Sequence, residues 1–185
     1  MKFLKLFIII FISLTTSIKA DLDKKLMNQL KDGGNLIFIR HAYAPGSGDP
    51  NNFNLDDCTT QRNLNKDGRK QAQYIGEFFI KNKIKIDKVL SSEWCRCKET
   101  AKIAFKNFST ISFLNSFYSS KYVKNKDKQI RALNGYLKNF GSKQNLILVT
   151  HYVLISEVLN YGPSSGEIVV SDRNFNIIGS IEINY

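Results

Sequence analysis

The chain has 185 residues, a formal net charge of +11 at pH 7 and three cysteines. This length suffices for one domain with a substantial hydrophobic core. The positive charge favours anionic partners, such as nucleic acids, anionic membranes or phosphorylated molecules. The sequence has no recognisable nucleic-acid-binding motif and no Cys/His spacing typical of zinc sites. We therefore expect neither a nucleic-acid partner nor a bound metal.

The first 20 residues have the organisation of a secretory signal peptide. A basic start, MKFLK, precedes an apolar run of about nine residues and a small residue, Ala20, at a plausible cleavage site. The run is shorter than the roughly 20 residues that span a bilayer as a helix. We predict a signal peptide at 1–20, one domain at 21–185, and an exported protein, periplasmic or secreted, without stable membrane insertion after cleavage. A retained N-terminal anchor is the alternative.

The next segment predicts a helix, a strand and a long loop. Leucines at 22, 26 and 30 have helical spacing, and two glycines at 33–34 end the pattern. The apolar run at 36–39 is typical of a strand that is covered on both faces. Residues 41–63 are polar and rich in Gly, Asn and Asp, so they predict a long loop, and long loops in compact domains are often functional.

The remaining segments alternate between predicted helices and strands. Helical spacing of apolar residues predicts helices over 65–80, 101–108, 130–140 and from 151 to about 160; apolar runs predict strands at 86–92, 109–114 and 146–150. The last two strands, 167–171 and 176–183, are separated by a short polar segment, which predicts an antiparallel hairpin at a sheet edge. This order predicts an α/β fold, with helices on both faces of a mainly parallel sheet.

Three of the predicted strands end in residues suited to chemistry. Arg40 and His41 follow the first strand, Arg96 comes shortly after the second, and His151 follows the fourth; His41 and His151 are the only histidines in the chain. In open α/β sheets, ligands bind beyond the carboxyl ends of the strands. We expect these side chains to lie together at one edge of the sheet.

The combination of histidine and arginine suits phosphoryl chemistry. A neutral imidazole is a good nucleophile near pH 7, and guanidinium groups match phosphate oxygens two at a time. Arg40, Arg62 and Arg96 could therefore neutralise a phosphate dianion and its transition state. A metal bound by the histidines with Cys95 or Cys97 is less consistent with neighbouring arginines. A cysteine-nucleophile phosphatase is disfavoured because CRCKETA lacks the glycines and the following arginine of such a loop.

The three cysteines leave the disulfide pairing open. In an exported protein two cysteines can pair, with one left over. Cys95 and Cys97 are too close in sequence for an easy bridge, so Cys58 could pair with either of them. Three free thiols are the alternative.

Four segments resemble the histidine phosphatase superfamily, which has the phosphoglycerate-mutase-like fold. They are FIRHA, LNKDGRKQA, VLSSEWCRCKETA and ILVTH, in the family's order over residues 36–151. The chain looks most like small exported members, in which the pattern of CTTQRNL (58–64) also occurs. The resemblance implies a three-layer α/β/α sandwich and a metal-independent reaction without a cofactor. His41 would form a phosphohistidine, and Arg40, Arg96 and His151 would surround the phosphoryl oxygens.

The resemblance leaves several roles to be tested. We interpret Arg62 as a substrate-binding phosphate contact, with a surface ion pair as the alternative. We hypothesise that a Cys58–Cys95 bridge positions both Arg62 and Arg96. Relative to the family pattern, Ala42 replaces a glycine, Asn65 replaces a threonine at a helix cap, and Tyr152 replaces a smaller or acidic residue.

The general acid of the family has no counterpart at its usual place. Many members have a glutamate after the third strand, but the corresponding segment 113–123 contains no acidic residue. Glu93, Asp56 and Asp57 are possible substitutes. The sequence therefore favours a phosphatase that hydrolyses a phosphate monoester of a small molecule or phosphoprotein through a phosphohistidine. The alternatives are a phosphohistidine phosphatase and a non-catalytic phosphate-binding module. The sequence does not determine the natural substrate or the oligomeric state.

Overall fold

The computed structural model describes residues 24–141 and 143–184. The predicted signal peptide and its cleavage site lie outside these residues. Within them, a six-stranded sheet has the order β3-β2-β4-β1-β5-β6. Its strands are β1 (Leu36–Arg40), β2 (Ile86–Ser91), β3 (Ser109–Thr110), β4 (Asn145–Thr150), β5 (Ile168–Ser171) and β6 (Ile177–Ile181). The helices are residues 24–32, α2 (Lys66–Lys81), α3 (Cys95–Phe105), α4 (Lys126–Asn139) and α5 (Tyr152–Leu159).

The strand pairing confirms the predicted sheet. β4 lies between β1 and β2 and is parallel to both, and β3 is parallel to β2. β5 is antiparallel to β1 and β6 to β5, as expected of an edge hairpin. Arg40 is in register with Thr150, and Ser91 with Val149, so β1, β2 and β4 all end at the same edge.

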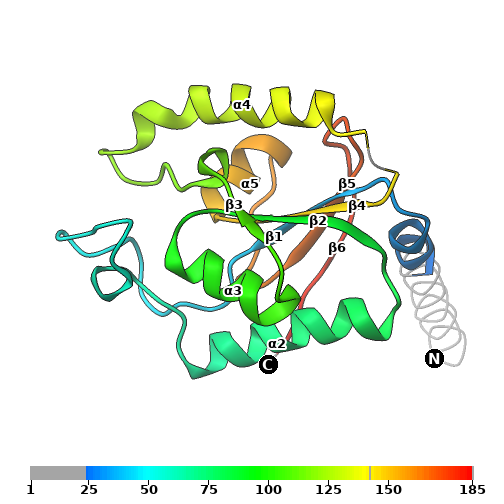
Figure 1. Cartoon of the computed structure of the whole chain (residues 1–185), viewed down its shortest axis with the longest axis horizontal. Coiled ribbons are helices and arrows are strands. Elements are labelled where there is room, and N and C mark those ends of the chain that lie inside the picture. Colours follow the sequence, from blue (N-terminus) through cyan, green and yellow to red (C-terminus); the bar gives the residue numbers. More distant parts are fainter. Residues whose placement is uncertain (1–23, 142, 185) are drawn as a thin grey trace, which may run out of the picture.

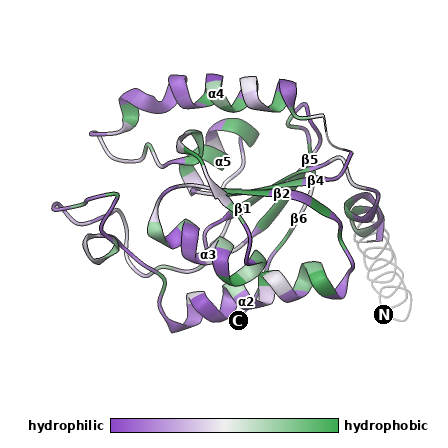
Figure 2. Cartoon of the chain, viewed as in Figure 1, coloured by the Kyte–Doolittle hydropathy of each residue, from purple (hydrophilic) through white to green (hydrophobic). Residues whose placement is uncertain are grey.

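Helices cover both faces of the sheet, which confirms the three-layer sandwich (Figure 1). Alternate residues of β1 point to opposite faces, as the pleat requires. Ile37 and Ile39 pack with α2, α3 and the helix at 24–32, whereas Leu36 and Phe38 pack with α4 and α5. Figure 2 shows the strands at the hydrophobic end of the scale between helices with hydrophilic outer surfaces. No helix among the described residues is long and apolar enough to cross a membrane.

The predicted third strand at 109–114 is wrong beyond its first two residues. β3 ends at Thr110, and Ser112–Leu114 form a 3-10 turn. Phe113 and Leu114 are consecutive and both buried in the core on the α4 side, which the alternation of a strand does not allow. Gln129 of α4 donates to the carbonyls of Ser112, Phe113 and Asn115, which replaces strand pairing for this segment.

The third predicted helix begins earlier and ends earlier than its apolar spacing indicated. α3 starts at Cys95, so Arg96 lies in its first turn rather than in a loop after β2. It ends at Phe105 because Lys106 adopts a positive φ of 65°, which leaves Phe108 outside the helix. The loop at 41–63 is also partly ordered by a 3-10 turn, Cys58–Thr60. The start of α3 thus places its first residues beside the ends of β1 and β4.

Candidate active site

A cavity of about 410 Å³ lies at the carboxyl edge of the parallel strands. Its lining contains all five predicted phosphate-site residues: Arg40, His41, Arg62, Arg96 and His151. One wall is formed by the loop after β1, including residues 46–51 and Phe53, and the other by residues 116 and 118–122. The parallel register of β1, β2 and β4 therefore brings together side chains that are far apart in the sequence.

The glycine of LNKDGRKQA allows the helix after this loop to approach it. A Cβ atom on Gly68 would lie 1.9 Å from the carbonyl oxygen of Tyr43. Asn65 caps α2 by accepting a hydrogen bond from the Gly68 N–H, as the sequence predicted. Gln71 of the same helix accepts from the Tyr43 N–H and donates to Ser165 and Ile183 carbonyls. The start of α2 thus fixes the chain immediately after His41.

His41 presents one nitrogen as a potential nucleophile. Its backbone N–H donates to the Thr150 carbonyl at 2.9 Å, which continues the pairing of β1 with β4. Its ring Nδ1 lies 2.8 Å from the Ala42 carbonyl oxygen, which can only accept a hydrogen bond. Nδ1 therefore bears the hydrogen, and the lone pair of the neutral ring is on Nε2.

His151 is oriented by partners on both ring nitrogens. Nη2 of Arg96 lies 3.4 Å from its Nδ1 and donates to it, since guanidinium is only a donor. Its Nε2–H then donates to the Ser92 hydroxyl at 2.8 Å, and that hydroxyl donates to Asn115 Oδ1. The rings of His41 and His151 lie edge to face with centroids 5.6 Å apart. The two histidines thus share one side of the cavity.

Burial keeps both rings neutral. Loss of solvation, followed by the nearby charge of Arg96, lowers the pKa of His41 and that of His151 well below the usual 6.5. A neutral imidazole retains its nucleophilic lone pair. His41 is therefore in its nucleophilic form at neutral pH.

Two arginines in the cavity lack a complete set of acceptors. Nη1 of Arg40 donates to the Pro163 carbonyl at 2.8 Å, and its guanidinium lies over the Tyr152 ring. Among the described residues, the buried side-chain nitrogen and oxygen atoms without a hydrogen-bond partner are Nε of Arg40 and Nε of Arg96. Buried donors rarely stay unpaired, and each costs about 1–3 kcal/mol when they do. These donors suit an anion in the cavity.

Sequence reasoning did not identify Asp49, which is the acidic residue among those that line the cavity. Its carboxylate accepts from Arg96 Nη1 at 2.7 Å and Nη2 at 3.2 Å. The Trp94 indole N–H and the Arg62 backbone N–H also donate to it, each at 3.1 Å. A single aspartate in a polar loop has no periodicity that would have distinguished it. Its position between Gly48 and Pro50 fitted only the long loop that the sequence predicted.

The three acids that the sequence suggested as general acids do not line the cavity. Glu93 accepts a hydrogen bond from the Asn115 side chain. Asp57 caps the 3-10 turn at 58–60 by accepting from Thr59. Asp56 lies in the same exposed turn. None of them is therefore positioned to protonate a leaving group in this structure.

Arg62 lies in the wall of the cavity and anchors the loop. Its Nε donates to the Gly48 carbonyl at 2.8 Å, and its Nη1 donates to the Ala44 carbonyl. Its guanidinium is thus held by loop carbonyls beside Arg96. A substrate contact by Arg62 remains a prediction.

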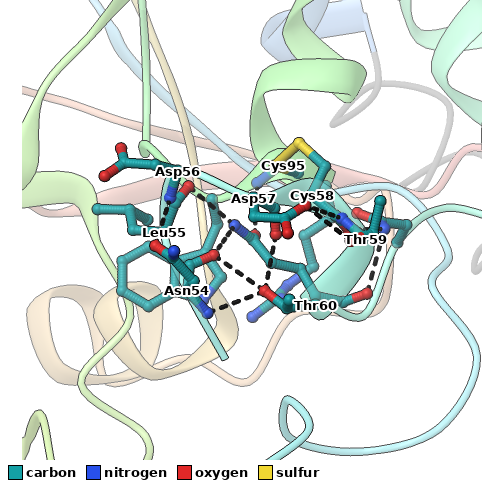
Figure 3. Close-up of a disulfide and its surroundings, with 12 residues drawn as sticks. Asn54, Leu55, Asp56, Asp57, Cys58, Thr59, Thr60 and Cys95 are labelled. Carbon is teal, nitrogen blue, oxygen red and sulfur yellow. Dashed lines mark hydrogen bonds between the residues drawn. A yellow bond between two sulfur atoms is a disulfide. The ribbon is translucent and has the colours of Figure 1, made fainter. Parts of the chain in front are cut away.

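A disulfide joins Cys58 to Cys95, the pair that we hypothesised (Figure 3). It connects the loop after β1 to the first residue of α3, directly beside Arg96. Gln61 reinforces the link, because its Oε1 accepts from the Cys95 N–H. The structure excludes a Cys58–Cys97 bridge and three free thiols, and Cys97 is buried and free. Burial raises the pKa of the Cys97 thiol to about 12, so this thiol stays protonated.

Comparisons with known proteins agree with this fold. The sequence model of the histidine phosphatase superfamily, branch 1, matches residues 36–114. Over these residues, the chain is similar to the histidine phosphatase superfamily. No curated protein sequence matches the chain.

Solved structures of several histidine phosphatases and a mutase share the fold. A protein from Agrobacterium tumefaciens assigned as the phosphohistidine phosphatase SixA is 17% identical, with a TM-score of 0.56, and the match covers 81% of this chain and 99% of that one. A phosphoglycerate mutase from Thermus thermophilus is 16% identical, with a TM-score of 0.55 and coverages of 81% and 99%. A phosphoserine phosphatase from Entamoeba histolytica is 19% identical, with a TM-score of 0.52 and coverages of 74% and 89%. At these identities, the similarity establishes the fold.

The neutral histidines predict a stability that falls on acidification. Below about pH 6.5 the unfolded chain binds protons at His41 and His151 that the folded chain does not bind, because burial lowers both folded pKa values. The free energy of unfolding should therefore decrease by up to about 1.4 kcal/mol per pH unit for each histidine as the pH falls below about 6.5. Urea unfolding between about pH 7.5 and about pH 5.5 measures this slope.

Substitution of either histidine by glutamine should reduce the slope by about half. The same slope in the double variant His41→Gln/His151→Gln as in the wild type would contradict this assignment.

Proposed function

We propose that this protein hydrolyses a phosphate monoester through a phosphohistidine on His41, without a metal or cofactor. The observation that supports this most directly is the pair of unpaired, buried Nε–H donors of Arg40 and Arg96 beside a neutral histidine. A phosphoryl dianion supplies acceptors for both donors and an electrophile for the histidine.

The first step forms a phosphorus–nitrogen bond. The lone pair on His41 Nε2 attacks phosphorus as the bond between phosphorus and the ester oxygen breaks. The leaving oxygen takes its electron pair and acquires a proton from solvent. The ring becomes a phosphorylated cation, and the Ala42 carbonyl stabilises that cation because it accepts from Nδ1–H at 2.8 Å. The two arginines stabilise the charge on the phosphoryl oxygens in the transition state.

The second step regenerates the enzyme. Water attacks phosphorus, the phosphorus–nitrogen bond breaks, and the bonding electrons return to His41 Nε2. The attacking water loses a proton to solvent and its oxygen leaves as part of inorganic phosphate. His41 ends in the same neutral form, with its hydrogen on Nδ1.

Replacement of the nucleophile should abolish turnover. The segment 21–185 should hydrolyse para-nitrophenyl phosphate in the presence of a chelator, and His41→Ala should lower kcat by about a thousandfold or more. Steady-state kinetics measures this, with circular dichroism to show that the variant is folded. Tight binding of inorganic phosphate by folded wild-type protein without any turnover would instead support a non-catalytic binding module.

A phosphohistidine phosphatase is the second candidate. It is favoured by the absence of a free acid among the described residues that line the cavity, since Asp49 is bound to Arg96. An alkoxide leaving group needs a proton donor, whereas a good leaving group, such as protonated imidazole, needs less help. A phosphohistidine peptide and an aryl phosphate should therefore be hydrolysed at least about tenfold faster than an alkyl phosphate. Equal rates for aryl and alkyl esters would show that an acid acts on the leaving group.

We also propose that the protein is exported, as the sequence of residues 1–20 indicates. The Cys58–Cys95 disulfide supports this, because such bonds persist in oxidising compartments. After expression in a bacterial host, the protein recovered from the periplasm or medium should begin at Asp21 when sequenced from its N-terminus. Recovery of uncleaved protein in the cytoplasm alone would contradict export.

A further inference from the structure

We propose that Asp49 is a positioning residue for Arg96, a role that rests on the proposed phosphatase function. It binds the two terminal nitrogens of the guanidinium and thereby fixes the orientation of Arg96 beside His151. Asp49 thereby acts through Arg96 and touches no reacting atom.

The contacts around Asp49 define a single orientation of Arg96. The carboxylate binds Nη1 and Nη2 together, with one oxygen on each. The side chains are 4% exposed for Arg96 and 17% exposed for Asp49, so solvent screens this pair far less than a surface pair. A two-point contact with a planar group fixes its plane as well as its position.

Asp49 is itself held by donors from the start of α3 and from its own loop. Trp94 donates to one of its oxygens, and the Trp94 ring stacks on Phe53 with centroids 5.1 Å apart. The Arg62 N–H donates to the other oxygen. The Cys58–Cys95 disulfide ties the same loop to the start of α3. The position of Arg96 is thus set by the loop through Asp49.

This arrangement does not suit a general acid. All four donors around the carboxylate stabilise its charged form. Burial raises the pKa of Asp49, but hydrogen bonding and charge from Arg96 outweigh it, and the pKa lies below its usual value. The carboxylate therefore has no proton to give at neutral pH.

The arrangement also differs from that of a competitor for phosphate. Asp49 uses the terminal nitrogens of Arg96, whereas the nitrogen without a partner is Nε. Asp49 therefore leaves one nitrogen of Arg96 without a partner, which a group that occupied every donor of the guanidinium would not do. A competitor would instead have to leave before phosphate could bind.

Asp49→Asn separates positioning from simple electrostatics. In asparagine, an NH2 group takes the place of one carboxylate oxygen. This NH2 group cannot accept a hydrogen bond from Arg96 or Trp94, so the two-point contact is lost. Removal of a negative charge beside the arginines would by itself strengthen phosphate binding. Loss of the orientation of Arg96 should instead weaken it. We expect the Kd for inorganic phosphate, measured by titration calorimetry, to rise by at least about fivefold.

Glu99→Gln is the matched control. Glu99 lies on α3, as Arg96 does, and forms an arginine–carboxylate pair with Arg69 at 2.6 Å. This pair does not line the cavity. Its loss should change phosphate affinity by less than about twofold, as for an exposed ion pair. The double variant Arg96→Lys/Asp49→Asn should bind phosphate no more weakly than Arg96→Lys, because Asp49 acts through the guanidinium.

The same variants test the reaction. Asp49→Asn should lower kcat by about tenfold to a hundredfold, and equally for para-nitrophenyl phosphate and an alkyl phosphate. A loss confined to the alkyl ester would make Asp49 a general acid and overturn the proposal. Tighter phosphate binding by Asp49→Asn would show that Asp49 competes with phosphate. An unchanged phosphate affinity in the folded variant would show that Asp49 has only a structural role. Either result would overturn the proposal. Absence of turnover in the wild type would refute the proposed function, while the sign of the change in phosphate affinity would still decide the role of Asp49.

Discussion

Burial of the Arg96 guanidinium is the constraint on which the rest of the site depends. A charge taken out of water is costly unless other groups satisfy it. Asp49 accepts from its two terminal nitrogens, and His151 lies beside one of them, yet Nε remains without a partner. Under the proposed function, a phosphoryl oxygen supplies the missing negative charge.

The same positive charge also contributes to the state of the histidines. Burial lowers the pKa of both rings, and the charge of Arg96 lowers it further, so both rings are uncharged at neutral pH. The hydrogen bond from His41 to the Ala42 carbonyl then decides which nitrogen holds the lone pair. A ring held in this form needs no separate base before it attacks phosphorus. Under the proposed function, the groups that bind the anion therefore also prepare the nucleophile.

Much of this site follows from the sequence because it depends on the ends of strands. Apolar runs before Arg40 and His151 predicted buried parallel strands, and the geometry of a parallel sheet places their ends together. The order of four short motifs then indicated the family and the role of His41. The start of α3 could not be predicted as well from the sequence, because Cys95 and Arg96 lie before the first apolar position with helical spacing.

Residues set by tertiary contacts could not be predicted in this way. Asp49 becomes important only when the loop folds over α3 and brings it to Arg96 and Trp94. The strand predicted at 109–114 failed because Gln129, 15 or more positions away, supplies donors to its carbonyls. Local patterns contain no information on such partners. The choice between Cys95 and Cys97 as partner of Cys58 was of the same kind, because it depends on which side of α3 faces the loop.

Direct detection of the phosphorylated enzyme tests the central claim. The segment 21–185 would be mixed with para-nitrophenyl phosphate, stopped within one turnover by alkali, in which phosphohistidine survives, and digested for mass spectrometry. The account predicts a phosphoryl group on the peptide that contains His41, and none on that peptide when the reaction is allowed to finish. Turnover with His41 unmodified at every time point, or with the phosphoryl group on another residue, would contradict it.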